Sequence, residues 1–358
     1  MSGTANGTSA AGGGTGTGFE RARAVADAVL YEGYLLYPYR RSAVKNRMRW
    51  QFGVVAPRRW AEASGPVEPV VAGSVESWQQ QTECLFEAGR PARDVVIRVR
   101  LRFLRVRAKD VERRLDGRYL PVDSVDVDGV GHLSVDEALP QEFDVAARLS
   151  DLLAADLVRD IHLPGGDRIE QLGRGIRIVR RSAPVSASLV LHVHRVDAAL
   201  HRVRVRVENT GDVDGAASRA EALRHSLVAT HVLIGGTGLA FLSMMDPPEP
   251  AVGHAERSRN IHTFPVLVGA SRDLVLSSPI LLPDHPEVAP ESPGDLHEAA
   301  EIDELLSLRT LTLTDEEKRE ARATDPRAAE ILDRVDTMPP EVLSRLHGTL
   351  RSLRRPPA

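Results

Sequence analysis

Cysteine is almost absent from this chain of 358 residues, in which Cys84 is the only one. A single thiol excludes an internal disulfide framework, a multi-thiolate zinc site and an iron–sulfur cluster ligated by this chain alone. Long apolar runs are missing too, since no stretch approaches the roughly 20 residues that a membrane-spanning helix needs. We therefore expect a soluble cytoplasmic protein with no membrane span and no resident cofactor.

Lysine is scarce as well, occurring only at Lys45, Lys109 and Lys318, so that the basic charge is almost entirely arginine. The 46 basic and 50 acidic residues nearly balance, with a formal net charge of -4. This balance gives no global reason to expect a nucleic-acid partner. Arginine still matters locally, because its planar guanidinium is always charged and pairs well with carboxylates.

Composition divides the chain into five segments. Glycine, serine, threonine and alanine dominate the start, which cannot bury enough apolar surface to fold and is predicted to be disordered. The expected segments are a disordered tail at 1–18, an N-terminal α+β module at 19–150, a β-sandwich-like module at 151–282, a proline-rich acidic linker at 283–296 and a helical appendage at 297–358.

Alternating apolar residues predict the strands. In 95–107 the apolar positions alternate with arginines, and the phase flips at Phe103-Leu104, where we expect a β-bulge. The apolar faces of 189–193 and 203–207 predict a hairpin with a short link. The fold class is therefore α+β, with a β-rich body of antiparallel sandwich-like or barrel-like modules.

Turn residues predict the ends of strands, and helical spacing of apolar residues predicts the helices. Asp116-Gly117 and Asp128-Gly129 predict turns, and Gly235-Gly236-Thr237-Gly238 predicts a hairpin loop. A short helix is expected from Phe19 to about Tyr31, and the capping box that begins at Thr314 predicts helices near the C-terminus. Further strands are expected at 226–234, 239–245, 264–268 and 274–281.

His192 and His194 form the first candidate site, because residues two apart on a strand point the same way, as a metal-binding pair requires. Aligning the hairpin faces places them opposite Arg202 and Arg204, or Arg204 and Arg206. A divalent cation beside these arginines would be repelled. We therefore expect no metal here, but a solvated basic face or a surface that docks anions.

Asp284, His285 and Glu287 form a second candidate, since a carboxylate beside an imidazole suits acid–base catalysis. No nucleophile or metal ligand is identifiable as their partner. The favoured interpretation is a polar segment that caps turns and contacts a neighbouring element.

A basic stretch near the N-terminus is interleaved with aromatic residues, a composition found in nucleic-acid-binding proteins. The C-terminal third carries a complementary acidic stretch, so the two could satisfy each other within one chain or in a protein complex. We favour the protein-partner interpretation over nucleic acid. The basic residues and their aromatic neighbour are Arg40, Arg41, Lys45, Arg47, Arg49 and Trp50.

The acidic segment at 283–304 is followed by leucines at helical spacing, among them Leu305 and Leu306. We interpret this combination as a docking element, in which charge guides encounter and the leucines supply affinity. A strap that packs the C-terminal helices onto the β body within the chain is the alternative.

Two stretches carry a resemblance to a known family. They are VLYEGYLLYPYRRSAVKNRMRWQFG at 29–53 and SSPILLPDHPEVAPESPGDLHEAAEIDELLSLRTLTLTDEEKREARATDPRAAEILD at 277–333. They resemble an uncharacterised family encoded beside nickel–iron uptake hydrogenases of actinobacteria and some other aerobic bacteria. The resemblance implies a role in hydrogenase assembly, maturation or attachment, and it implies no catalytic residue.

Each hydrogenase subunit that carries metal needs several thiolate ligands. With one cysteine, this chain cannot be the catalytic subunit or the cluster-bearing subunit. The leading hypothesis is a non-catalytic accessory protein whose partners are hydrogenase subunits or maturation factors. Two alternatives remain open at this point: a hydrolase-like enzyme that uses carboxylates and His285, and a nucleic-acid-binding regulator that uses Arg40–Arg49.

Overall fold

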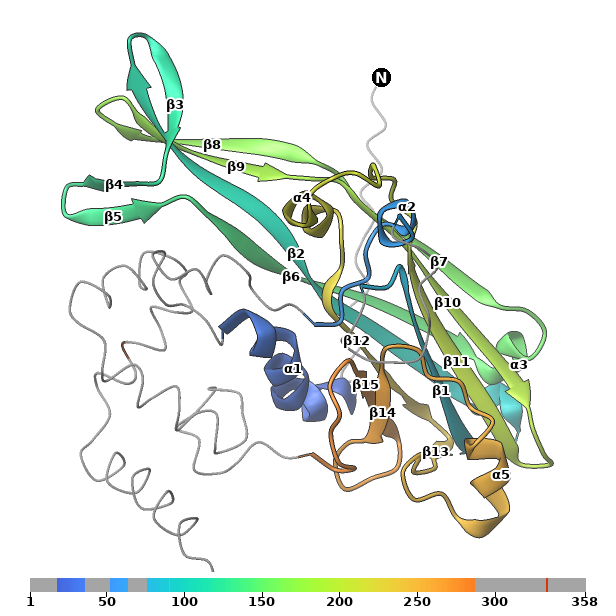
Figure 1. Ribbon diagram of the computed structural model, residues 1–358. Coiled ribbons are helices and arrows are strands. Elements are labelled where there is room, and N and C mark those ends of the chain that lie inside the picture. The colour runs from blue at the N-terminus through green and yellow to red at the C-terminus, as the bar shows by residue number, and fades with distance from the viewer. Residues whose placement is uncertain (1–17, 36–51, 64–75, 90, 287–332, 334–358) are drawn as a thin grey trace, which may run out of the picture.

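The computed structural model describes residues 18–35, 52–63, 76–89, 91–286 and 333. Two antiparallel sheets pack face to face in this part of the chain (Figure 1). Both sheets are open, so the body is a sandwich rather than a barrel, and the predicted β-rich α+β class is confirmed. No helix of the described residues is long and apolar enough to cross a membrane.

The five-stranded sheet has the order β13-β1-β11-β10-β7. Its strands are β13 (Leu239–Phe241), β1 (Gln79–Ala88), β11 (Leu200–Asn209), β10 (Val185–Arg195) and β7 (Leu157–Leu163). The predicted hairpin is confirmed, because β10 and β11 pair from Ala187↔Asn209 to Arg195↔His201.

The larger sheet is built around β2 (Val96–Leu115), which has 20 residues. One edge of β2 pairs with β12 and then β9, and the other pairs with β6 and then β3. The remaining strands are β14 (Phe264–Leu267), β15 (Leu274–Ser278), β12 (Val228–Thr237), β9 (Ile176–Ser182), β8 (Gly166–Gly173), β6 (Val135–Arg148) and β3 (Arg118–Val122).

A separate hairpin and short helices complete the described chain. The hairpin is β4 (Ser124–Val127) with β5 (Val130–Leu133). The predicted first helix is present as η1 (Gly18–Ala22) and α1 (Arg23–Leu35). The other helices are α2 (Arg58–Ala61), η3 (Ala92–Asp94), α3 (Leu149–Leu152), α4 (Arg219–Arg224), η4 (Glu249–Ala251) and α5 (Val252–Ala255).

The main core lies between the two sheets and draws on both predicted modules. Ile97 and Phe103 of β2 are fully buried in the same cluster as Leu189 of β10 and Val205 of β11. In addition, β1 pairs with β13 on one side and β11 on the other. Residues 19–150 and 151–282 therefore contribute strands to the same core. Alternation predicts that a segment is a strand, but it carries no information about which strand will be its neighbour.

The phase flip in β2 has a different cause from the one predicted. Pairing with β6 is unbroken from Val96↔Arg148 to Lys109↔Val135, so β2 contains no bulge against that neighbour. The bulge lies in β12, where Val228 pairs with Leu104 and His231 with Arg102. Apolar residues change face because α1 covers the outer face of β2 there, and Leu104 packs with Leu30.

The glycines at 235–238 do not form the predicted hairpin loop, because β12 and β13 belong to different sheets. Gly236 lies within β12, where an added Cβ would stand 2.1 Å from the carbonyl oxygen of Val96. Glycine permits this close approach of two backbones, and Gly238 has a φ of +72°. This segment therefore carries the chain from one sheet to the other.

A bent hairpin joins the sheets on the far side. Strands β7 and β8 pair with β10 and β9 in one continuous register, from Leu157↔Leu191 to Gln171↔Arg177. Strands β7 and β10 form the half of this hairpin that lies in the five-stranded sheet. Strands β8 and β9 form the half that lies in the larger sheet. The change of sheet occurs beside Pro164 and Pro184, whose missing N–H groups cannot donate to a ladder.

Candidate interaction surface

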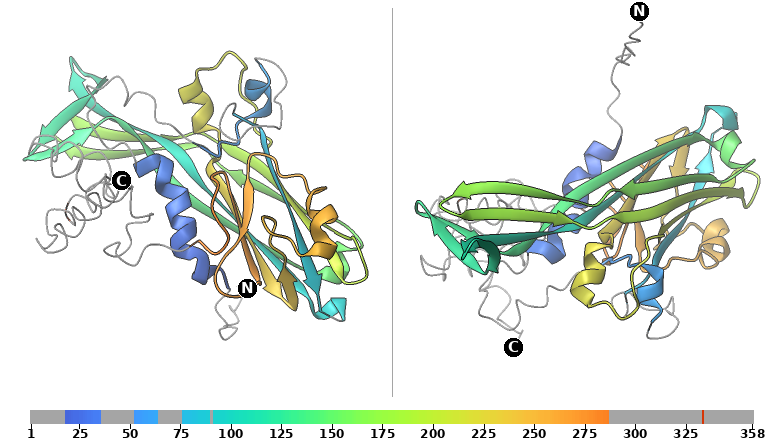
Figure 2. Two further views of the ribbon diagram at one scale, coloured as in Figure 1. Left: turned by 60° about the horizontal axis from the view of Figure 1, so that its bottom comes forward. Right: turned by 90° about the horizontal axis from the view of Figure 1, so that it is seen from above.

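A long β arm projects from the sandwich, and Figures 1 and 2 show the larger sheet continuing into it past the region where the two sheets overlap. It consists of the second half of β2 with β3, β8, β9 and the β4–β5 hairpin. Twenty residues at about 3.3 Å each make β2 roughly 65 Å long. The arm therefore holds its far end well away from the main core.

Three tight turns close the hairpins of the arm. Each has two residues with positive φ, between +48° and +84°, as type I′ turns require. The predictions at Asp116-Gly117 and Asp128-Gly129 are confirmed, and Arg174-Gly175 is the third. Type I′ turns match the right-handed twist of the strands, so these residues fix the register of the arm.

The arm has a small core of its own, separate from the main one. Val111 of β2 and Ile176 of β9 pack against Val125 and Val127 of β4. The β4–β5 hairpin thus covers one face of the arm. Because this cluster shares no residue with the main core, the arm is stabilised locally.

Ion pairs stabilise the opposite face. Glu112 is buried and accepts hydrogen bonds from Arg177 and Arg181 at 2.7 and 2.9 Å. Burial opposes a charge on Glu112, but the bonds from Arg181 and Arg177 outweigh it and lower the pKa of this carboxyl. Arg181 also pairs with Asp110. Arg177 lies over the Tyr119 ring, 3.9 Å from its centroid, which extends this network to β3.

The end of the β2–β3 hairpin carries two leucines and two arginines on one face, which we call the basic–apolar tip. Pairing of Arg113 with Leu120, and of Leu115 with Arg118, places all four side chains on the same side. The leucines are 48% and 46% exposed. The two arginine side chains form no hydrogen bond or ion pair with a described residue. This surface can bind a partner that offers carboxylates beside apolar groups.

Sequence reasoning missed the basic–apolar tip, although a signal was present. On each side of the Asp116-Gly117 turn, an arginine and a leucine lie two positions apart. In a two-residue hairpin the residues that flank the turn pair directly. The sequence could therefore have predicted that these arginines and leucines share one face of the hairpin. The turn alone was predicted.

The histidine pair has the first of the two predicted registers, with His192 opposite Arg204 and His194 opposite Arg202. Nδ1 of His192 lies 2.6 Å from a carboxylate oxygen of Asp156. Burial, and then the charge of Arg202, lower the pKa of His194. Within the described ranges, no three His, Cys, Asp or Glu side chains are grouped as a metal ion would require.

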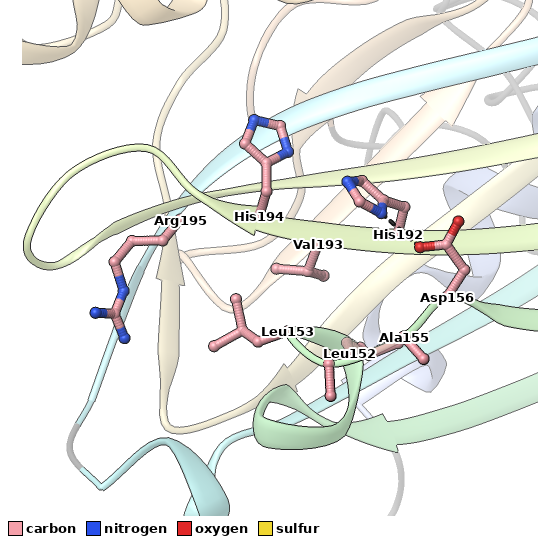
Figure 3. Close-up of a pocket in the computed structure, with 9 residues that line it drawn as sticks. Leu152, Leu153, Ala155, Asp156, His192, Val193, His194 and Arg195 are labelled. Atoms are coloured by element: carbon pink, nitrogen blue, oxygen red, sulfur yellow. Dashed lines mark hydrogen bonds and ion pairs between the residues drawn. The ribbon is translucent and has the colours of Figure 1, made fainter.

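A pocket of about 460 Å³ lies beside this pair, where β10 extends past the start of β7 (Figure 3). His192, His194 and Asp156 line it together with Leu153 and Val193. Its lining is otherwise largely apolar, and His192 and Asp156 already satisfy each other.

Glu83 of β1 lies beside the arginines that face the histidine pair, and the sequence pattern did not predict it. Its side chain is 1% exposed, and it accepts hydrogen bonds from Nε of Arg204 at 2.6 Å and from the amide of Arg259 at 2.9 Å. Nε of Arg202 lies 3.9 Å away. The arginine row is therefore partly neutralised by a buried carboxylate of this chain.

Asp284 and His285 attach the segment after β15 to its neighbours. One Asp284 oxygen accepts from the Ser243 hydroxyl at 2.5 Å and the other from the Leu267 amide at 2.8 Å. Nδ1 of His285 lies 2.6 Å from the Gly269 carbonyl oxygen. Each of these contacts joins the segment to another loop or strand, as the turn-capping interpretation predicts.

The remaining predicted interaction residues lie outside the described residues, together with nearly all of the tail and the helical appendage. They stay predictions. These residues are Arg40, Arg41, Lys45, Arg47, Arg49, Trp50, Glu287, Leu305 and Leu306.

Comparison of the chain with models of known protein families finds no match, and comparison with curated proteins finds none either.

Proposed function

We propose that this chain is a non-catalytic accessory protein that assists assembly, maturation or attachment of a nickel–iron hydrogenase in the cytoplasm. Its partner is a hydrogenase subunit or a maturation factor. The resemblance of 29–53 and 277–333 to proteins encoded beside such hydrogenases motivates the choice of partner. The single structural observation in favour of a binding role is the basic–apolar tip at the end of a projecting arm.

The chemistry of the tip favours a protein partner. Two arginines that form no ion pair with a described residue lie beside two half-exposed leucines. Arginine is among the residues that contribute most to interfaces, and leucine adds apolar area on burial. A complementary surface would present carboxylates around an apolar centre. The tip lacks an aromatic side chain on this face, and aromatic rings are what single-stranded nucleic acids stack on.

The experiment is affinity purification of the full chain from cells that make the hydrogenase. We compare the wild type with L115S/L120S and with R113S/R118S, which alter only exposed positions. Val158→Ser, at an exposed apolar position on β7, is the matched control. We expect hydrogenase proteins with the wild type and the control, and a loss of about tenfold or more with the tip variants.

Recovery that is unaffected by both tip variants would contradict the role of the tip. Absence of hydrogenase proteins in repeated purifications, with hydrogenase activity intact in a deletion strain, would contradict the proposed function. Recovery of RNA or DNA that decreases as the salt concentration rises would favour the nucleic-acid alternative instead.

A further inference from the structure

Strand β8 forms an outer edge of the arm, as Figure 1 shows. It is the last strand in the order of the larger sheet, and no described strand pairs with its outer side. From Gly166 to Gln171 every side chain is exposed, with Ile169 at 53%. This stretch contains no proline, so every second residue, whose N–H and C=O point away from β9, can pair with another strand.

The sequence of β8 is complementary to itself. Two copies paired antiparallel about a twofold axis at Ile169 place Arg168 of each copy opposite Glu170 of the other. Directly opposite residues have Cβ atoms about 5 Å apart, so both ion pairs can form. Asp167 then faces Gln171, and the two copies of Ile169 cover each other.

Neighbouring symmetric registers lack this match. A twofold axis perpendicular to the sheet keeps each side chain on its own face, and it must lie midway between two copies of the same residue. An axis at Arg168 would put two arginines opposite each other, and an axis at Glu170 would put two glutamates together. Like charges directly opposite destabilise a sheet, so only the register centred on Ile169 is favourable.

Among the described residues, Arg168 also has no carboxylate within ion-pair distance. Its cross-strand neighbour on β9 is another arginine, Arg180. Arg180 is satisfied by Glu170, 2.6 Å away, and by Glu137, 3.2 Å away. Arg168 itself forms no hydrogen bond or ion pair with a described residue. A second Glu170 would supply the missing counter-charge.

Strand β6, another edge of this sheet among the described strands, is protected against such pairing. Strand β6 carries Pro140 near its middle and presents Glu142 and Asp144 on its exposed face. Proline and like charges are the usual means by which an edge strand avoids other copies. The contrast between β6 and β8 indicates that the two edges have different roles.

We propose that two copies of this chain associate through β8, forming a continuous sheet across a twofold axis at Ile169. The contact is short, with five residues from Asp167 to Gln171 on each side. It is therefore a weak, concentration-dependent dimer rather than an obligate one.

The test is sedimentation velocity of the full chain over roughly 5 to 500 µM. We expect the wild type to dimerise across this range. Arg168→Glu and Glu170→Arg should each be monomeric alone, because both pairs between positions 168 and 170 become like-charge pairs. An equimolar mixture of these two variants should dimerise again, because the acidic strand of one then faces the basic strand of the other.

Val158→Lys, on the exposed face of β7, is the control and should dimerise as the wild type does. Circular dichroism verifies that each variant is folded. A wild type that stays monomeric throughout would overturn the proposal. A dimer that survives both single variants, or variants whose mixture stays monomeric, would overturn it as well.

Discussion

Arg105 shows how one buried side chain secures the junction between arm and sandwich. Its guanidinium donates to the carbonyl oxygens of Pro164 and Ala183, each at 2.6 Å. These carbonyls belong to the two strands of the bent hairpin at the point where it changes sheet. Arg105 therefore supplies hydrogen bonds where the backbone ladder is interrupted. Burial, and the nearby charge of Arg107, lower its pKa.

Replacing Arg105 by Met should lower the free energy of unfolding by about 2 kcal/mol, because two carbonyls lose the charged donor that a buried side chain supplies. Urea denaturation monitored by circular dichroism measures this change. Arg114→Met, at an exposed position, is the matched control and should be nearly neutral. Equal stability of the two variants would contradict the role given to Arg105.

His231 makes stability depend on pH. Burial, with a smaller contribution from Arg102, lowers its pKa to about 3. In the unfolded chain this histidine has an ordinary pKa near 6.5. The unfolded state therefore binds a proton first as pH falls, and stability is lost below that value. The loss from pH 7 to pH 5 is about 2 kcal/mol for this residue.

His231→Asn tests this assignment, because asparagine keeps an N–H donor for the Ala229 carbonyl oxygen but does not titrate. We expect the difference in unfolding free energy between pH 7 and pH 5 to shrink by about 2 kcal/mol. Urea denaturation at the two pH values measures it. An unchanged difference would assign the pH dependence to other histidines.

At the scale of elements, sequence patterns predicted the strands but not their surroundings. The Asp-Gly turns, the β10–β11 hairpin and the first helix follow from local propensity, and they are present. The bulge in β12 could not be located from the sequence of β2. The apolar residues of a strand also change face when a helix covers the strand's outer face, as α1 covers β2. Likewise, the predicted glycine loop is a change of sheet, which depends on distant partners.

The arm should open independently of the sandwich. Val125→Ala weakens its small core, which shares no residue with the main one. We expect faster hydrogen exchange in 118–133 and 166–178, with β10 and β11 unchanged and the melting temperature within about 2 °C of the wild type. Hydrogen-exchange mass spectrometry measures this. Faster exchange throughout the molecule would show that arm and sandwich unfold as one unit.

At the scale of the molecule, the predicted modules share one core. A fragment of residues 151–358 lacks β1 and β2, which pair with β11, β13, β12 and β9. We expect it to be unfolded alone and to refold with residues 1–150, as circular dichroism and NMR chemical-shift dispersion would show. A dispersed spectrum for either fragment alone would contradict the shared core.

The candidate surface was predicted less well than the fold. The basic–apolar tip depends on a face that exists only once Arg113 and Leu120 are paired. Glu83 and Arg204 meet across strands 121 residues apart in the chain. Composition alone pointed instead to charge-rich segments, of which Asp284 and His285 are the described members.

The shared core also governs how the chain must be made. Strand β2 leaves the ribosome long before β12, its partner at Leu104↔Val228. At about 5 to 20 residues per second, the roughly 120 intervening residues take about 6 to 25 seconds to synthesise. During that interval the edge of β2 that later pairs with β12 has no partner strand. Arginines at every second position from Arg98 to Arg102 would then act as electrostatic gatekeepers, keeping nascent copies apart until the partner strand arrives.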